Sequence, residues 1–317
     1  MLGTVFYFVL NMSVASCFVI AALLFIRQIR PLSRRIVYPL WGLAFFRLVM
    51  PFAFPTGWSL FNFTGGLVKR LITVEAITQG VAPSWDSSAP LAMNFIGAAE
   101  KYMPVEYKTE SLRQIFTTAS VIWAIFAAAA LIAAAILYTL TRRELKKAVR
   151  IKGSLYHSDM VLSPVLTGII RPKIILPVSL DHESGEGEMV LAHERVHARR
   201  LDNLWRMLGI CITCIHWFNP FAWLMLRAFL ADMELSCDET VIKKYSAEER
   251  RAYAGSLLRF AEDKRLLVSA AFGRSGVKVR IVNVLNYKRL TMIGAAASFL
   301  LLLAVALVLI TNPQLGG

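Results

Sequence analysis

Residues 192–202 read AHERVHARRLD, and within them HERVH places two of the chain's five histidines four positions apart. We predict a helix over residues 186–200, because the first turn of that stretch is acidic and suits the positive end of a helix dipole. Residues four apart share one face of a helix. His193 and His197 can therefore bind one metal ion, and HExxH is the spacing at which two histidines bind zinc.

Glu194 follows the first of these histidines directly. A carboxylate at this position can face the open coordination site of the metal. Zinc lowers the pKa of a bound water to about 7, and a neighbouring carboxylate takes the proton. We therefore predict Glu194 as the general base. The alternative is a charged, solvated helix face that binds no metal.

A candidate for the third metal ligand lies further along the chain, in DMELSCDE at residues 232–239. Glu234 and Asp238 are one helical turn apart, so Glu234 can bind the zinc while Asp238 hydrogen-bonds a ligand histidine from behind. Cys237 stands between them at a helical position from which we expect no contact with the metal. The alternative is that the acidic residues of this stretch form a charged surface.

The composition excludes a soluble protein. Hydrophobic residues make up 56% of the 317 residues, charged residues only 18%, and the mean hydropathy is +0.55. A soluble domain carries roughly 25% charge. With 35 Lys and Arg against 21 Asp and Glu the net charge is +14, which in so apolar a chain indicates basic cytoplasmic loops rather than direct nucleic-acid binding. Four cysteines provide no disulfide framework.

Four apolar stretches are long enough to cross a bilayer, which requires about 20 residues. They cover residues 5–26, 36–55, 114–141 and 290–310. Arginines and lysines cluster between the first and second stretches, after the third and before the fourth. By the positive-inside rule, both termini and the 56–113 loop lie outside, and residues 142–289 lie in the cytoplasm.

A fifth apolar run, at residues 207–226, contains Asn219-Pro220. Proline inside such a run ends or kinks a helix. We predict two helices that meet near residues 218–220, as a hairpin that is re-entrant or lies at the membrane surface. A spanning segment here would separate Glu234 from His193 by the whole membrane, so the hairpin and the metal site support each other.

The cytoplasmic segment opens with SPVLTGIIRPKIILP at residues 163–177, where prolines and a glycine separate short β-branched runs. We predict strands near residues 169–170 and 174–176, at the edge of a small sheet. The fold class is therefore a mainly α membrane protein. It has four transmembrane helices and a cytoplasmic gluzincin-type zinc domain, with a small β-sheet and the helical hairpin.

Several stretches together resemble a known family. HERVHARRLD, CIHWFNPFAW and MELSCDETV, preceded by SPVLTGIIRPKIILP, are similar to the antirepressor metallopeptidases of the Bla/Mec type, over residues 1–311. These are multi-pass zinc proteases of the bacterial cell membrane that transduce β-lactam signals and are linked to antibiotic resistance. The resemblance implies that zinc binds to His193, His197 and Glu234, and that Glu194 is the catalytic base.

The resemblance also implies a domain layout and a substrate. Residues 1–141 would form a three-span membrane region, 142–289 the cytoplasmic protease domain, and 290–317 the fourth transmembrane helix with a short extracellular tail. The expected substrate is a cytoplasmic protein, a DNA-binding transcriptional repressor. Family members also cleave themselves before the last span, and we predict this cut at Ala271-Phe272.

The sequence departs from the family in one respect. Well-known members continue after the last span into an extracellular penicillin-binding sensor domain, and residues 311–317 contain none. We therefore expect no β-lactam binding by this polypeptide, and a separate sensor protein and a homodimer stay open as partners. Two other functions also stay open: a housekeeping membrane protease resembling the CAAX prenyl proteases, and a non-enzymatic metal-binding transmembrane transducer.

Overall fold

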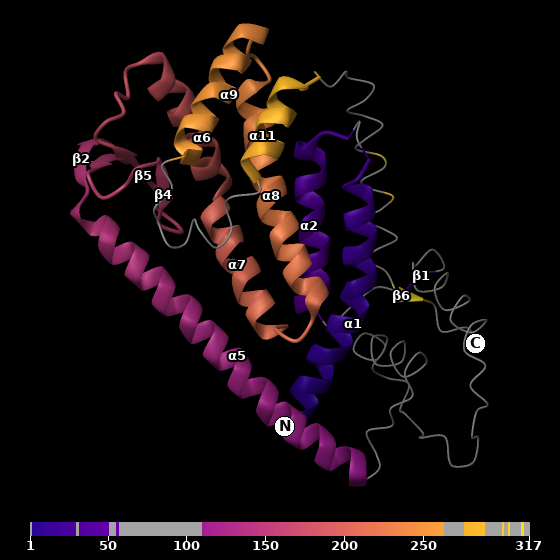
Figure 1. Cartoon of the computed structure of the whole chain (residues 1–317). Coiled ribbons are helices and arrows are strands. Elements are labelled where there is room, and N and C mark those ends of the chain that lie inside the picture. Colours follow the sequence, from indigo (N-terminus) through magenta and orange to yellow (C-terminus); the bar gives the residue numbers. More distant parts are fainter. Residues whose placement is uncertain are drawn as a thin grey trace. The chain divides into compact units, whose positions relative to one another are not determined.

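The computed structural model describes residues 2–29, 32–50, 55–56, 110–262, 276–288, 300, 304 and 312–313. Helices dominate this part of the chain (Figure 1). The chain divides into two compact units. The first contains Met1–Phe25, Leu40–Phe126 and Ala296–Gly317, and the second contains Ile26–Pro39 and Ala127–Ala295.

The first unit is built from parts of three helices, α1 (Leu2–Ile26), α2 (Arg34–Val49) and α5 (Glu110–Glu144). Aromatic rings join α1 to the first half of α5. The centroid of the Phe6 ring lies 6.3 Å from that of Phe116 and 5.7 Å from that of Trp123. A short parallel pair, β1 (Pro55–Thr56) with β6 (Asn312–Pro313), belongs to the same unit.

Two helical stretches in the described part of the chain, Leu2–Ile26 and Gln114–Lys147, are long and apolar enough to cross a membrane. They correspond to the first and third predicted spans. The second predicted span, residues 36–55, overlaps α2, which has 16 residues, ends at Val49 and contains Pro39. Of the fourth, only residues 300 and 304 are described. The predicted domain boundaries stay predictions.

The second unit contains a four-stranded mixed sheet, which confirms the predicted small sheet. The strands β2 (Val149–Lys152), β3 (Leu155–Ser158), β4 (Val165–Thr167) and β5 (Lys173–Pro177) lie in the order β2-β3-β5-β4. Of the three neighbouring pairs in this sheet, β3 and β5 are parallel and the other two are antiparallel. The strand predicted at residues 169–170 is wrong. Gly168, with φ of 90°, ends β4, and the two isoleucines fall in the bend that follows.

Helix α6 (Gly185–Arg200) confirms the helix predicted over residues 186–200. The Ser184 hydroxyl caps its first turn by accepting a hydrogen bond of 3.1 Å from the Gly187 amide. Val190 and Leu191 pack in one buried cluster with residues of β5, so one face of the helix lies on the sheet. The sheet thus supports the helix that carries HERVH.

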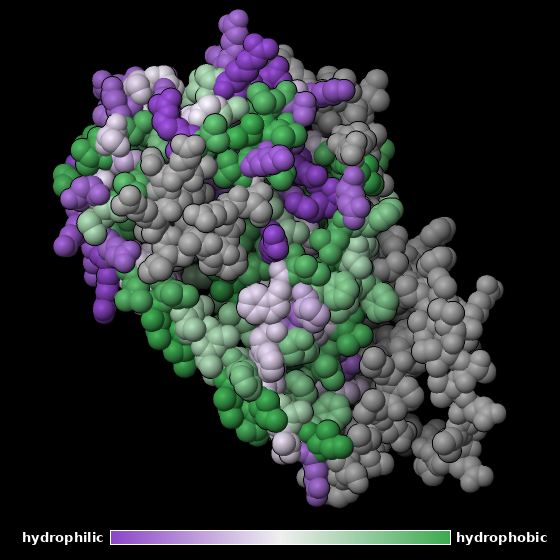
Figure 2. Space-filling view, in the orientation of Figure 1, coloured by the Kyte–Doolittle hydropathy of each residue, from purple (hydrophilic) through white to green (hydrophobic). Residues whose placement is uncertain are grey.

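Helices α7 (Asp202–Ile215) and α8 (Pro220–Ile242) form the predicted hairpin. Asn219 ends the connection, because its side-chain oxygen accepts a hydrogen bond of 2.9 Å from the Phe221 amide and caps α8. Figure 2 shows hydrophilic residues over the end of this unit that carries α9. Large apolar side chains near the hairpin are exposed, among them Trp205, Leu208, Trp223 and Leu224. This surface suits a membrane interface.

Two further helices complete the surroundings of α6 and α8. They are α9 (Ala247–Glu262) and α11 (Gly276–Leu285), which pack against each other; α11 also packs on α8, and α9 on α6 (Figure 1). One buried cluster joins all four helices and consists of Val196, Cys237, Val241, Ile242, Tyr253, Ala254 and Val284. HERVH therefore faces three helices that come from later in the chain.

Candidate metal centre

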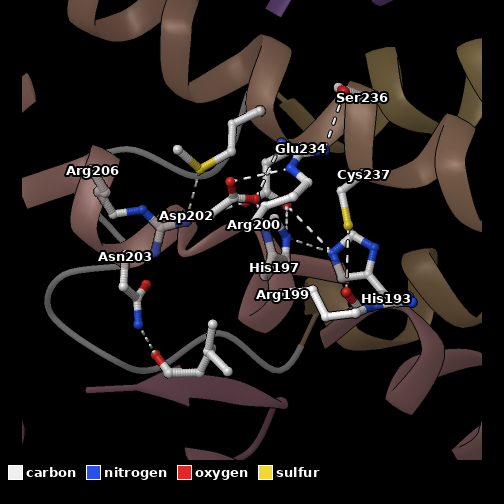
Figure 3. A network of polar contacts seen from close by, with 12 residues as sticks. His193, His197, Arg199, Arg200, Asp202, Asn203, Arg206, Glu234, Ser236 and Cys237 are labelled. Carbon is white, nitrogen blue, oxygen red and sulfur yellow. Dashed lines mark hydrogen bonds and ion pairs between the residues drawn. The ribbon is translucent and has the colours of Figure 1, made fainter. Parts of the chain in front are cut away.

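The two histidines of HERVH point at each other from successive turns of α6 (Figure 3). Their Nε2 atoms lie 3.1 Å apart, and the two residues are 8% and 5% exposed. The alternative of a solvated helix face is therefore wrong, because both rings are buried. Two ring nitrogens this close, with no apolar group between them, have the spacing of ligands to one metal ion.

Glu234 of α8 completes a triangle with these nitrogens. Its Oε2 atom lies 3.7 Å from Nε2 of His193 and 3.8 Å from Nε2 of His197. Ligands at 2.0–2.2 Å from a tetrahedral zinc ion are about 3.4 Å apart. The edges of this triangle are close to that spacing, and the Arg280 guanidinium also lies here, with Nη2 3.4 Å from Nε2 of His193.

Cys237 lies closer to this centre than its helical position led us to expect. His193, His197 and Cys237 are all buried, and their ligand atoms lie within 4.8 Å of one another, so this group can also hold a metal ion. The Cys237 sulfur already contacts the backbone oxygen of His193 at 3.4 Å. The Glu234 oxygen, 3.7–3.8 Å from both nitrogens, is the other candidate for the third ligand.

Nδ1 of His193 faces two partners behind the metal position. Asp238 Oδ1 lies 3.2 Å from it and the Tyr253 hydroxyl 2.8 Å from it, and that hydroxyl donates a hydrogen bond of 2.7 Å to the same carboxylate. Arg280 holds Asp238 from the other side with two hydrogen bonds of 2.8 Å. We call Asp238, Tyr253 and Arg280 the His193 clamp.

Nδ1 of His197 faces a second carboxylate. Asp202 Oδ2 lies 2.6 Å from it, and the Tyr38 hydroxyl donates a hydrogen bond of 2.9 Å to Asp202 Oδ1. Arg200 forms an ion pair with the same carboxylate at 3.1 Å and a hydrogen bond at 3.2 Å (Figure 3). We call Asp202, Tyr38 and Arg200 the His197 clamp.

The junction of α6 and α7 brings Asp202 to this position. Leu201 adopts the left-handed conformation, with φ of 54° and ψ of 41°. A residue with a side chain pays roughly 1–2 kcal/mol for that conformation. The turn ends α6 and starts α7 at Asp202, which places this carboxylate beside the last turn of α6. The sequence contained a signal for it in HARRLD, an acid five positions after the second histidine, but we did not recognise it.

Charges of both signs meet around Glu234. Arg280 Nη1 lies 3.2 Å from its Oε2, and Arg206 Nη2 lies 3.4 Å from its Oε1. Burial alone would raise the pKa of this carboxyl, but His197 and Arg280 outweigh burial and hold it well below its usual range. Glu234 is therefore ionised, as a metal ligand must be.

The carboxylates of this stretch are not a charged surface, so that alternative is also wrong. Asp232 and Asp238 are fully buried, Glu239 is 4% exposed, and the Glu234 side chain is 30% exposed. Burial favours a neutral Asp238, yet the Arg280 guanidinium and His193 keep its pKa well below the ordinary value. Each buried acid has a basic or hydroxyl partner.

Burial lowers the pKa of His193 and His197, but the neighbouring Cys237 and the carboxylates outweigh burial and raise both pKa values well above the usual one.

Glu194 is half-buried on α6, next to His193, and forms no polar contact with the residues that the structure describes. Ala271 and Phe272 lie outside the described residues.

Comparison with known proteins shows the family of this chain. Residues 7–284 match the BlaR1 peptidase M56 family. The chain belongs to this family. It is 31% identical to the regulatory protein BlaR1 of Bacillus licheniformis over 171 residues, which cover 51% of this chain and 28% of BlaR1.

Other relatives are more distant. The chain is 26% identical over 105 residues to the methicillin resistance mecR1 proteins of Staphylococcus aureus strain Mu50 and Staphylococcus epidermidis. These matches cover 32% of this chain and 18% of each mecR1 protein. The chain thus matches less than a third of the length of these relatives. The M56 peptidase family confirms the resemblance inferred from HERVH and the stretches around it.

Proposed function

We propose that this M56 peptidase is an integral membrane zinc endopeptidase of signal transduction. It cleaves a cytoplasmic protein, and the names of its relatives, a regulatory protein and methicillin resistance proteins, favour a transcriptional repressor. The observation that carries the proposal is the triangle of His193, His197 and Glu234, with edges of 3.1, 3.7 and 3.8 Å. Each histidine has a carboxylate behind it, as ligand histidines do.

When bound, zinc supplies a Lewis acid that lowers the pKa of a water molecule to about 7. Asp202 accepts a hydrogen bond from Nδ1 of His197, and the Tyr253 hydroxyl, which donates to Asp238, accepts one from Nδ1 of His193. Each Nε2 thus keeps its lone pair for the metal. Glu194 accepts the proton of the water and delivers it to the nitrogen of the leaving amine. Its place directly after His193 on α6 and its half-buried side chain support this role.

We also propose that this site faces the cytoplasm and that both termini lie outside. In the second unit, the basic segment between α1 and α2 binds α8. Arg27 forms an ion pair with Asp232 at 2.9 Å, and Arg35 lies 3.9 Å from Glu239. By the positive-inside rule such an arginine-rich segment is cytoplasmic. The site helix that binds it would then be cytoplasmic as well.

Self-cleavage at Ala271-Phe272 is part of the proposal. Helix α9 ends at Glu262 and α11 begins at Gly276, and both contribute a residue to the His193 clamp. A segment attached at both ends to helices of the site is a tethered substrate at high effective concentration.

The test uses the full chain in lipid nanodiscs, loaded with zinc, and peptides prepared from bacterial cytoplasmic proteins. Mass spectrometry reads the cuts in the peptides and in the chain itself. We expect cleavage by the wild type and a rate lower by about 10²- to 10⁴-fold for Glu194→Gln, with the zinc content unchanged. Equal cleavage by both proteins would refute the mechanism. A wild type that binds zinc and cuts nothing would favour the non-enzymatic transducer.

A further inference from the structure

The segment between α1 and α2 is attached to the helix that carries Glu234. Arg27 donates hydrogen bonds of 2.9 and 3.1 Å to the two oxygens of Asp232, which is fully buried. Glu239 accepts hydrogen bonds from the backbone amides of Arg34 at 3.1 Å and Arg35 at 3.3 Å. A carboxylate at these amides caps the first turn of α2. The start of α2 is thereby fastened to α8.

Tyr38, one turn further along α2, reaches the His197 clamp. Its ring stacks on Phe229 of α8, with centroids 5.5 Å apart and an angle of 16° between the planes. The Arg200 guanidinium lies 4.3 Å above the Tyr38 ring. These contacts direct the hydroxyl at Asp202 Oδ1, 2.9 Å away, while the other oxygen of Asp202 faces His197 at 2.6 Å.

We propose that Tyr38 is a positioning residue of the metal centre, acting on His197 through Asp202. The inference rests on the proposed zinc site. A carboxylate held at one oxygen only can rotate about its Cβ–Cγ bond, whereas a hydroxyl on the second oxygen fixes its plane. Asp202 is 1% exposed, so water cannot easily replace that hydroxyl. A fixed Asp202 orients the His197 ring and directs Nε2 at the metal position.

The contribution of Tyr38 is separable from packing. Phenylalanine retains the ring, its stacking on Phe229 and its contact with Arg200, and removes only the hydroxyl. Loss of a partner behind a ligand histidine lowers metal affinity by about 10- to 100-fold. We expect about 10-fold for Tyr38→Phe, at the lower end of that range, because Arg200 still holds Asp202.

The experiment measures the zinc affinity of the full chain in lipid nanodiscs by competition with a chromophoric chelator. Tyr287→Phe is the matched control, since its hydroxyl accepts a hydrogen bond from Arg35 at 3.4 Å but contacts no carboxylate of the centre in the described part of the chain. Phe229→Leu controls for packing around the Tyr38 ring. We expect weaker zinc binding for Tyr38→Phe alone, with a changed visible spectrum of the cobalt-substituted protein.

A double-mutant cycle with Asp202→Ala tests the path of the effect. If Tyr38 acts through Asp202, Tyr38→Phe has no further effect on zinc affinity in the Asp202→Ala background. Wild-type affinity in Tyr38→Phe, or equal losses in Tyr38→Phe and Phe229→Leu, would overturn the inference and leave the zinc site intact. A wild type that binds no zinc would overturn the proposed function, and the inference with it.

Discussion

The two clamps hold equivalent histidines with the same three kinds of side chain, yet they come from different parts of the chain. The His193 clamp is built from α8, α9 and α11, and the Arg280 side chain in it is 15% exposed. The His197 clamp is built from α2, the end of α6 and the start of α7, and its Arg200 side chain is 24% exposed. Hydrogen bonds from arginine to the carboxylate are 2.8 Å in the first clamp and 3.2 Å in the second. The contact between arginine and carboxylate is thus tighter in the His193 clamp than in the His197 clamp.

The residues on which both clamps converge carry the largest expected effect. Glu234 Oε2 lies near the Nε2 atoms of both histidines. Glu234→Ala therefore removes a proposed ligand even when both clamps are intact. We expect zinc affinity to fall by more than the roughly 100-fold limit of changes behind a ligand. Metal analysis after chelator competition measures it. Cys237→Ala is the control and should retain zinc, whereas the reverse result would make Cys237 the third ligand.

The tighter clamp should matter more for stability. Arg280→Met leaves Asp238 buried without its cation, and removal of one partner of a buried ion pair costs about 3–5 kcal/mol. We expect a clearly lower midpoint of thermal unfolding in nanodiscs. Arg259→Met is the control, because the Arg259 side chain is 68% exposed in its ion pair with Glu186, and such pairs contribute about 1 kcal/mol or less. An equal shift for both variants would contradict the buried pair.

For zinc affinity, in contrast to stability, the His197 clamp should matter more than the His193 clamp. When Asp238 becomes Asn, the Tyr253 hydroxyl still lies 2.8 Å from Nδ1 of His193. In the described part of the chain, Asp202 is the group that faces Nδ1 of His197, at 2.6 Å. Within the range of about 10- to 100-fold for such changes, Asp202→Asn should therefore lose more affinity than Asp238→Asn. Chelator competition on both variants decides this, and the opposite order would show that Tyr253 does not substitute.

The smallest expected effect is the dependence of zinc affinity on pH. The pKa values of His193 and His197 lie well above the usual one without metal, so protons on this pair of rings compete with zinc near neutral pH. Zinc binds the neutral rings and must displace those protons. Affinity should therefore rise with pH through neutrality and level off above the raised pKa values. Titration calorimetry in buffers of different ionisation enthalpy counts the protons released, and zero release at pH 7 would contradict protonated histidines.

The sequence was sufficient for the local features of this site. HERVH predicted the helix and the pair of histidines, and Asn219-Pro220 predicted the break between α7 and α8. Both rest on residues a few positions apart, whose geometry a helix or a proline determines. Glu234 and Asp238 share a helix face in the same way.

The rest of the clamps could not be predicted, because tertiary packing brings them together. Tyr38 and Asp202 are 164 positions apart in the chain, and His193 and Tyr253 are 60 apart. No spacing rule connects such residues. Our expectation for Cys237 considered the direction of side chains on one helix and did not include the close approach of α6 to α8, which brings the Cys237 sulfur within 4.8 Å of the histidine nitrogens.

Helix α8 has acidic residues on two of its faces, and this restricts the number of residues between them. Asp232 and Glu239 bind the segment between α1 and α2, while Glu234 and Asp238 lie at the metal centre. Each helical residue turns the chain by about 100°. One residue inserted between Glu234 and Asp238 would rotate Asp238 and Glu239 away from their partners while Asp232 and Glu234 kept theirs. Residues 232–239 can therefore change in identity at several positions, but in this family they should neither lengthen nor shorten.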